Sequence, residues 1–377
     1  MENSKYNILH VIDKYSMDGT NPSSCAYLIR DWFRYADKSR FNVMTCGLKK
    51  EEPAGEIYRQ EGIKVFFLGN GKYSIGNVTG LMKLIDREKI DLLHLHGYSS
   101  ANFGRIAARR KGIPNIVHEH AILKILPHQY LADLLLKKMT DSAIGVSGAV
   151  KEFLSKGRHV PAGLINIVYN GVNLNKFQKC DEAALAKLHQ EFSLTSDHII
   201  IGALTRLREE KGNEYLLRAM PKVIEKYPAA RLLIAGDGPL KESLENLIKE
   251  LGLEKHVFLI GFRTDILELL TLFDIMVIPS LNEGFGLVMV EAMAMQKPIV
   301  ATRVGGLIEI AGGTDSAIFV QPANSRELAE GLIDMIKDPG RAKKMAATGL
   351  LESKRFSIEK NVQKLEELYA RMLGKRK

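Results

Sequence analysis

The chain has 377 residues, of which 46% are hydrophobic and 26% are charged, and its formal net charge is +9. This length is too great for one ordinary hydrophobic core and predicts two domains, while the composition excludes a low-complexity chain and is typical of a soluble, globular protein. No apolar run approaches the ~20 residues that span a bilayer, and the N-terminus lacks the basic and apolar regions of a signal peptide. We therefore expect neither a membrane-spanning nor a secreted protein.

The cysteines indicate the cellular compartment of the protein, and the net charge limits the classes of partner that it can bind. Cys25, Cys46 and Cys180 lie far apart in sequence and lack the spacing of a metal site, which favours a reducing cytoplasm. A positive charge of this size fits nucleic acid, anionic lipid or phosphate-bearing substrates. The sequence contains no nucleic-acid-binding module, so we expect no nucleic-acid partner.

The first half of the chain alternates short apolar runs with helical stretches. The first run, residues 6–12, is followed by a loop that contains Gly19 and by a helix over about residues 23–36. Further strands are predicted at residues 42–47, 65–68, 92–96, 115–119 and 142–146. This rhythm predicts a doubly wound parallel sheet, with the glycine loop at the carboxyl edge where α/β proteins bind ligands. A plain tight turn at Gly19 is the alternative.

Two of these strands end in histidines. His96 ends the strand at residues 92–96, and the run His118-Glu119-His120 ends the next one. A single histidine at a strand end is more often a hydrogen-bonding residue than a catalyst. Alternate strand residues point the same way, but the run supplies only two imidazoles, so we expect no metal site here.

Basic residues gather in two places in this half. The segment 123–139 is apolar on part of its face and basic on the rest, and Arg105, Arg109, Arg110 and Lys111 form a second cluster. Basic amphipathic helices of this kind can bind the surface of an anionic membrane. An ordinary solvated face is the alternative, because basic faces are common in a chain of this net charge.

A charged connector separates the two halves, and we place the domain boundary within residues 178–195. The run at residues 198–204 opens a second strand–helix series. Just beyond it, Arg206 and Lys211 are five positions apart and can converge on one diphosphate, with Arg208 as an alternate for Arg206. A solvated loop is the alternative interpretation.

A strand, a glycine turn and a helix start follow one another further along the chain. The apolar run at residues 272–278 predicts a buried parallel strand, and good helix formers begin at Leu287. In the turn between them, Gly284 and Gly286 let the backbone approach a ligand closely. The first N–H groups of a helix lack intrahelical partners and its dipole is positive there, so this helix start favours a phosphate.

Two carboxylates flank that helix start. Glu283 lies in the turn, and Glu291 lies about one turn inside the helix, roughly 6 Å along its axis. Both can face one ligand whose diphosphate rests on the helix start, and carboxylates accept hydrogen bonds from sugar hydroxyls. The pattern predicts a nucleotide-sugar, against the alternative of a solvated glutamate and a structural turn. A strand at residues 298–302 followed by Gly305-Gly306 repeats the arrangement and favours the ligand.

This stretch also carries a family resemblance. Seven residues separate Glu283 from Glu291, and Pro298, Ala301-Thr302 and Gly305-Gly306 follow. With the upstream motifs, the string resembles the signature of the GT-B, retaining glycosyltransferases of family 4, and the resemblance covers nearly the whole chain. It implies an α/β GT-B fold with two Rossmann-like, doubly wound parallel-sheet domains that face each other across a cleft.

The resemblance implies a role for each domain. Residues 1–178 would form the N-terminal acceptor-side domain, and residues 179–354 would form the C-terminal domain that binds the nucleotide-sugar. A C-terminal helix at about residues 355–377 would return to the first domain.

The resemblance also implies the site residues. Lys211 and Arg206 match the pair on the donor diphosphate, and His120 matches a histidine near the transferred sugar. Asp18 stands where relatives carry the first of two glycines, so Gly19 is carried over alone. The implied catalytic residues are His120, Arg206, Lys211 and Glu283. The implied donor-binding residues are Gly19, Arg206, Lys211, Phe262, Glu283, Gly284, Phe285, Gly286, Leu287 and Glu291.

The implied reaction moves a sugar, with retention of anomeric configuration, from a nucleoside diphosphate sugar to a glycan or glycolipid acceptor in cell-surface polysaccharide biosynthesis. UDP is favoured over GDP on frequency alone. Arg206, Lys211 and the helix start would stabilise the departing diphosphate, so we expect neither a metal nor a cofactor, the nucleotide-sugar being a co-substrate.

Two other classes of protein stay open. One is a nucleotide-sugar epimerase or hydrolase of the same fold, and the other is a non-catalytic nucleotide-sugar-binding protein. We expect a cytoplasmic location with peripheral contact at the inner face of an anionic membrane. The sequence does not predict the oligomeric state.

Overall fold

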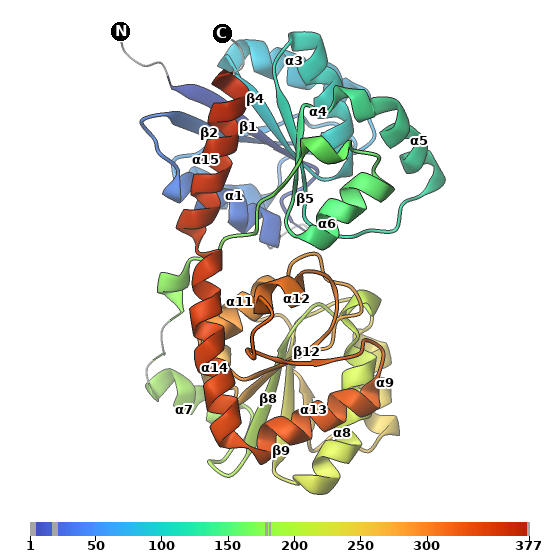
Figure 1. The fold of residues 1–377 in the computed structure, drawn as a ribbon, viewed down its shortest axis with the longest axis vertical. Coiled ribbons are helices and arrows are strands. Elements are labelled where there is room, and N and C mark those ends of the chain that lie inside the picture. Colours follow the sequence, from blue (N-terminus) through green and yellow to red (C-terminus); the bar gives the residue numbers. More distant parts are fainter. Residues whose placement is uncertain (1–4, 17–21, 178–179, 181, 375–377) are drawn as a thin grey trace. The chain divides into compact units, whose positions relative to one another are not determined.

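The structure, a computed structural model, describes residues 5–16, 22–177, 180 and 182–374. The chain divides into two compact units (Figure 1). The first unit comprises residues 1–171 and 358–377, and the second comprises residues 172–357. Among the described helices, none combines the length and the apolar character needed to cross a bilayer.

The first unit is built on a seven-stranded sheet in the order β3-β2-β1-β4-β5-β6-β7, and all neighbouring strands are parallel. The chain moves outward in one direction from β1 to β3 and in the other from β4 to β7. Because crossovers between parallel strands are right-handed, this reversal places helices on both faces of the sheet. The strands are β1 (Tyr6–Ile12), β2 (Phe41–Gly47), β3 (Lys64–Phe67), β4 (Leu92–His96), β5 (Asn115–Glu119), β6 (Ser142–Gly145) and β7 (Ile165–Ile167).

The helices of this unit connect the strands, with one addition from the far end of the chain. The last helix, α15 (Ile358–Gly374), packs against α1 (Figure 1). There the indole N–H of Trp32 donates to Oδ1 of Asn361 over 2.5 Å. The connecting helices are α1 (Ser24–Tyr35), α2 (Glu56–Arg59), α3 (Gly76–Glu88), α4 (Tyr98–Lys111), α5 (Pro127–Leu136) and α6 (Gly148–Glu152).

The second unit is built on a six-stranded parallel sheet in the order β10-β9-β8-β11-β12-β13. Its core is formed by aliphatic side chains from the strands and from the helices that cover them. The strands are β8 (Ile199–Leu204), β9 (Ala230–Ala235), β10 (Val257–Leu259), β11 (Ile275–Ile278), β12 (Ile299–Thr302) and β13 (Ile318–Val320). The helices are α7 (Glu182–Glu191), α8 (Asn213–Lys226), α9 (Lys241–Glu250), α10 (Ile266–Leu272), α11 (Leu287–Ala294), α12 (Gly305–Ala311), α13 (Ser325–Lys337) and α14 (Pro339–Ser353).

The doubly wound parallel sheet predicted for each half is confirmed. One predicted strand starts too early, because Leu272 is the last residue of α10 and the N–H of Phe273 still donates to Leu269 O. The units meet in sequence at Gly171 and Val172, a few residues before the predicted border, whose residues 178 and 179 lie outside the described part of the chain. The final helix begins at Ile358 and belongs to the first unit.

Candidate functional site

The second sheet has a topological switch point between β8 and β11. From β8 the chain continues to β9 and β10 on one side, and from β11 it continues to β12 and β13 on the other. In open α/β sheets, ligands bind outside the carboxyl ends of the strands at such a point. The loops that follow β8 and β11 therefore form the candidate site.

These two loops are joined by backbone contacts. The N–H groups of Leu281 and Asn282 both donate to Glu210 O, over 2.9 and 3.2 Å. A Cβ atom at Gly212 would lie 2.1 Å from Pro279 O, so only glycine allows the loops to come this close. Local sequence patterns identify each loop, but the contact between them depends on the strand order.

The joined loops bring Lys211 and Glu283 together. Nζ of Lys211 lies 2.5 Å from Oε2 of Glu283, and both side chains are largely buried. The hydroxyl of Ser280 also donates to Oε2 of Glu283, over 3.3 Å. The sequence predicts that both residues face a ligand, but it gave no sign that they form an ion pair with each other.

Arg206 lies in the same loop as Lys211 and is far more accessible. Its side chain is 51% exposed and lies 3.6 Å from the carboxylate of Glu210, which is itself exposed. Arg208 approaches the same carboxylate at 3.9 Å. Exposed pairs of this length contribute little energy, so either guanidinium can turn to a bound anion at small cost.

The glycine turn before α11 is compact. Gly286, with φ of 106°, is the residue before the helix, and a Cβ atom there would lie 2.4 Å from a methyl group of Leu307. Gly284 and Phe285 are buried as well, and the Phe285 ring contacts Phe356. In the structure, these residues pack closely against α12 and the hydrophobic core. Any contact of Phe285 with a ligand must therefore come from its backbone.

Glu291 lies in α11 beyond the first turn. Burial raises the pKa of its carboxyl group to about 7, and the nearby charge of Lys176 opposes that rise. Its carboxyl has no hydrogen-bond partner in the part of the chain that the structure describes. A half-buried carboxyl group without donors is suited to accept hydrogen bonds from the hydroxyls of a ligand.

Phe262 and Leu287 are two further residues that were predicted to bind the donor. Phe262 follows β10 and is 57% exposed, while its neighbour Arg263 is held by Asp265 and Glu191, each at 2.5 Å. Gly19 lies outside the described residues. Leu287 is the first residue of α11 and is half-buried.

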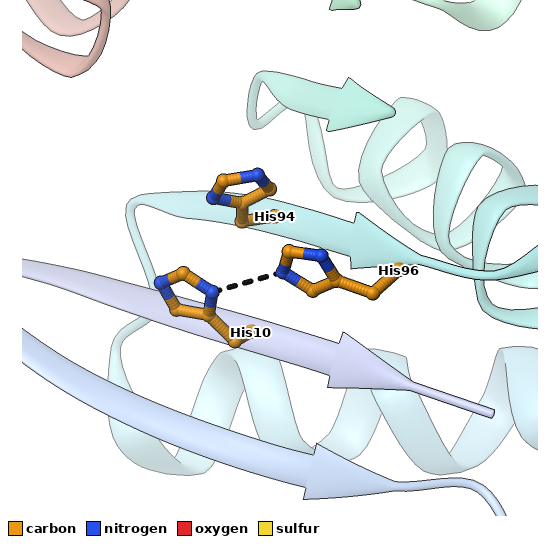
Figure 2. Close-up of side chains that lie close together, drawn as sticks. All are labelled: His10, His94 and His96. Atoms are coloured by element: carbon orange, nitrogen blue, oxygen red, sulfur yellow. Dashed lines mark hydrogen bonds between the residues drawn. The ribbon is translucent and has the colours of Figure 1, made fainter. Parts of the chain in front are cut away.

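His120 belongs to the first unit, where it is one of five clustered histidines. Parallel register aligns His10 with His94 and His96 with His118. Alternate strand residues share a face, so these rings and His120 gather on one side of the sheet. Nδ1 of His10 lies 3.0 Å from Nε2 of His96 (Figure 2). His10 and His94 were not singled out from the sequence, although their spacing along neighbouring strands could have indicated them.

The histidines form a continuous hydrogen-bonded chain with Tyr369 of α15. Tyr369 Oη lies 2.6 Å from Nδ1 of His94 and 3.4 Å from Nε2 of His10. His96 Nδ1 then lies 3.1 Å from Nε2 of His120. Burial lowers the pKa of every ring, to about 3 for His10 and about 4 for His120, so all five imidazoles are neutral at pH 7.

The predicted run His118-Glu119-His120 does not act as a single group. Glu119 points to the other face of the strand, where its carboxylate lies 2.8 Å from Nη1 of Arg158. Arg158 also contacts Asp133, which in turn contacts Arg105, and all four side chains are buried. This buried ion network was not predicted from the sequence.

Two family models match the chain. The one described as Glycosyltransferase Family 4 matches residues 29–176, and the one described as Glycosyl transferases group 1 matches residues 186–352. The chain belongs to the family 4 glycosyltransferases. This glycosyltransferase therefore has the enzyme class and the family that its sequence predicts.

Known proteins agree with this membership. An uncharacterized glycosyltransferase from Methanocaldococcus jannaschii is 36% identical over 200 residues, and the match covers 52% of this chain and 51% of that protein, about half of its length. The UDP-Gal:alpha-D-GlcNAc-diphosphoundecaprenol alpha-1,3-galactosyltransferase from Escherichia coli is 26% identical over 337 residues, which cover 84% of this chain and 86% of that one.

A solved structure shows the fold. The crystal structure of Anabaena Alr3699/HepE in complex with UDP and glucose matches with a TM-score of 0.82 at 24% identity, over 96% of this chain and 99% of that one. The predicted GT-B fold of this glycosyltransferase, with two parallel-sheet α/β domains, is thereby confirmed.

Proposed function

We propose that this glycosyltransferase moves a sugar, with retention of its anomeric configuration, from a UDP-sugar to a lipid-linked glycan acceptor in cell-surface polysaccharide synthesis. The meeting of Lys211 and Glu283 at the switch point of the second sheet carries the proposal. A cation can hold a diphosphate there, while the adjacent carboxylate accepts hydrogen bonds from the sugar.

The donor class follows from three further features of the same edge. The start of α11 offers unpaired backbone N–H groups to a phosphate, and Glu291 offers a carboxyl group without a partner to the ribose hydroxyls. Phe262 offers an exposed aromatic ring near the end of β10 to a base. UDP is favoured because the Anabaena structure holds UDP and glucose and the E. coli relative is named for UDP-Gal, and a GDP-sugar is the alternative donor.

The chemistry would consist mainly of stabilising the leaving group. As the bond between sugar and diphosphate breaks, negative charge grows on the departing oxygen. Lys211, Arg206 and the α11 start supply positive charge that is already in place, and preorganised donors of this kind contribute about 3 to 4 kcal/mol each. We therefore propose that turnover requires neither a metal nor a cofactor, so activity should survive EDTA.

The acceptor would be met at a membrane surface. The loop before α5 and the helix itself expose large apolar side chains, and lysines flank them. The apolar residues are Leu123, Leu126, Tyr130, Leu131, Leu134 and Leu135. The E. coli relative is named for a diphosphoundecaprenol-linked acceptor, which supports a cytoplasmic enzyme in peripheral contact with the inner, anionic face of the membrane.

The test begins with a thermal-shift screen of UDP-sugars and GDP-sugars. Release of free nucleoside diphosphate is then measured with and without a lipid-linked glycan acceptor. A transferase releases nucleoside diphosphate only when the acceptor is present, and the anomeric configuration of the product is read by NMR. Release without an acceptor would identify a hydrolase, interconversion of the donor sugar an epimerase, and binding without any turnover a non-catalytic protein.

A further inference from the structure

Three atoms of the first unit that could ligate a metal converge beside His120. Nε2 of His120 lies 3.1 Å from Nδ1 of His96 and 3.7 Å from Sγ of Cys25. All three atoms lie within 4.8 Å of one another. At most one hydrogen bond can use the lone pair or the proton of a given imidazole nitrogen, so hydrogen bonding alone does not account for both contacts of Nε2.

The separations suit a tetrahedral zinc ion. Bonds of about 2.1 Å to nitrogen and about 2.3 Å to sulfur give tetrahedral edges of about 3.4 Å between two nitrogens and about 3.6 Å between nitrogen and sulfur. The observed 3.1 and 3.7 Å lie close to these edges. One thiolate and two imidazoles also form a donor set that binds zinc in preference to magnesium or calcium.

The histidine chain orients one of these ligands. If Nε2–H of His96 donates to Nδ1 of His10, then Nε2–H of His10 donates to Tyr369, whose hydroxyl donates to Nδ1 of His94. Nε2–H of His94 then donates to Nδ1 of His118. His96, His10 and His94 each use their one proton in this chain, whereas Nε2 of His118 is buried without a partner among the described residues. Nδ1 of His96 is left with its lone pair toward the convergence point. A hydrogen-bonded outer partner of this kind is typical of histidine metal ligands.

The neighbouring triad of His10, His94 and His96, shown in Figure 2, is a poorer site although its atoms also lie close together. All three rings are fully buried, and their facing nitrogens are already committed to one another and to Tyr369. The triad also lacks an anionic ligand. Cys25 and His120, in contrast, are each partly exposed to solvent.

We propose that Cys25, His96 and His120 form a reversible binding site for a thiophilic divalent cation such as Zn²⁺. On binding, the Cys25 thiol loses its proton to solvent and its sulfur forms a bond to the metal. His120 binds the metal through Nε2 and holds its single proton on Nδ1. That nitrogen is buried and has no partner among the described residues. Lack of an outer partner weakens metal affinity by about 10- to 100-fold, and the fourth position is left to water. The ion is therefore a reversible ligand, not a resident structural metal.

Occupation of the site would inhibit transfer, a consequence that rests on the proposed function. The ion takes the lone pair of Nε2 of His120, the residue predicted to lie near the transferred sugar, and adds positive charge there. Micromolar Zn²⁺ should lower turnover, and EDTA should restore it. The metal therefore acts as an inhibitor of the enzyme. It takes no part in the proposed transfer reaction, which still requires no metal.

The binding test uses Co²⁺ as a coloured substitute for Zn²⁺ on the full-length protein and does not depend on transferase activity. The wild type should develop a thiolate-to-cobalt charge-transfer band that saturates at one ion per chain and disappears when Zn²⁺ is added. Cys25→Ser, which keeps the shape of the side chain, should abolish the band. Cys180→Ser, at a half-buried free cysteine of the second unit, should keep it.

Several outcomes would overturn the site. They are a wild-type protein without the band at 100-fold excess of Co²⁺, a band that persists in Cys25→Ser, and a band that is lost in Cys180→Ser. The first needs no variant, so a misfolded mutant cannot hide it. In the transfer assay, Cys25→Ser should be at least ten-fold less sensitive to Zn²⁺ than the wild type. Absence of any transferase activity would refute the proposed function, whereas active enzyme without a cobalt band would refute only the metal site.

Discussion

The two units differ in where their ionisable side chains lie. The buried histidine, arginine, aspartate and glutamate side chains of the described chain all lie in the first unit, namely His10, His94, His96, His118, Arg105, Asp133, Arg158 and Glu119. The second unit has an aliphatic core, and the ion pair of its candidate site, Lys211 and Glu283, lies at the carboxyl edge of its sheet with about 15% of each side chain exposed. The difference indicates that charge affects mainly the stability of the first unit and mainly the chemistry of the second.

Acid should test this comparison most strongly. The buried histidines are neutral in the folded state because burial lowers their pKa, whereas in the unfolded chain they bind protons below about pH 6.5. Their contribution is therefore fully present above pH 6.5 and is lost as the pH falls below it, by up to about 1.4 kcal/mol per pH unit for each ring. The first unit should unfold between about pH 6 and 4.

A single chromophore can follow that transition. Trp32, the one tryptophan of the chain, stacks on His94 and His118 at 5.8 and 5.5 Å between ring centroids. Its fluorescence should change first, while hydrogen exchange in α13 of the second unit should remain slow at the same pH. Unchanged Trp32 emission down to pH 4 would show that the histidine chain does not limit stability.

Breaking the buried ion network of the first unit should have the next largest effect, a loss of stability. Asp133 contacts both Arg105 and Arg158, so Asp133→Asn leaves two buried guanidinium groups short of a charge. We expect a loss of about 3 to 5 kcal/mol in the free energy of unfolding. Asp86→Asn, at an exposed partner of Lys111, should cost less than about 1 kcal/mol. Equal denaturant midpoints for the two variants would contradict the importance of burial.

In the second unit, charge removal should change rate more than stability. Lys211→Ala or Arg206→Ala should lower kcat by about 10²- to 10³-fold, because each removes charge that stabilises the departing diphosphate. The melting temperature should change little. Lys222→Ala, which removes an exposed ion pair with Glu330, is the control and should keep full activity. A double variant of Arg206 and Lys211 with nearly normal turnover would show that the donor is bound elsewhere.

The smallest effect should separate the two glutamates. The folded pKa of Glu291 is raised to about 7, so its ionisation destabilises the fold as the pH rises through the interval from about 4.5 to 7. Glu291→Gln should thus add about 1 to 2 kcal/mol of stability at pH 8 and almost none at pH 4.5, while it weakens UDP binding.

Glu283→Gln should spare UDP affinity and lower kcat. Calorimetry and steady-state rates would decide, and the reverse pattern would exchange the two roles.

Much of the fold could be predicted because its information is local. Apolar runs with β-branched residues predicted most strands to within a residue or two, as at β1 (Tyr6–Ile12) and β5 (Asn115–Glu119). The glycine turn before α11 and the charged loop after β8 were also found, since each is a contiguous stretch with its own spacing. The family followed from the same contiguous strings.

Contacts between distant segments could be decided only by the tertiary structure. Strand order places the loops after β8 and β11 side by side and thereby pairs Lys211 with Glu283. Parallel register, together with a helix from the far end of the chain, gathers His10, His96 and Tyr369 into one hydrogen-bonded chain. The sequence by itself determined which segments become strands, helices and ligand-binding turns, because backbone preference and hydrophobic periodicity act over a few residues. Which of those segments became neighbours depended on burying all their apolar faces at once, and no local pattern records that outcome.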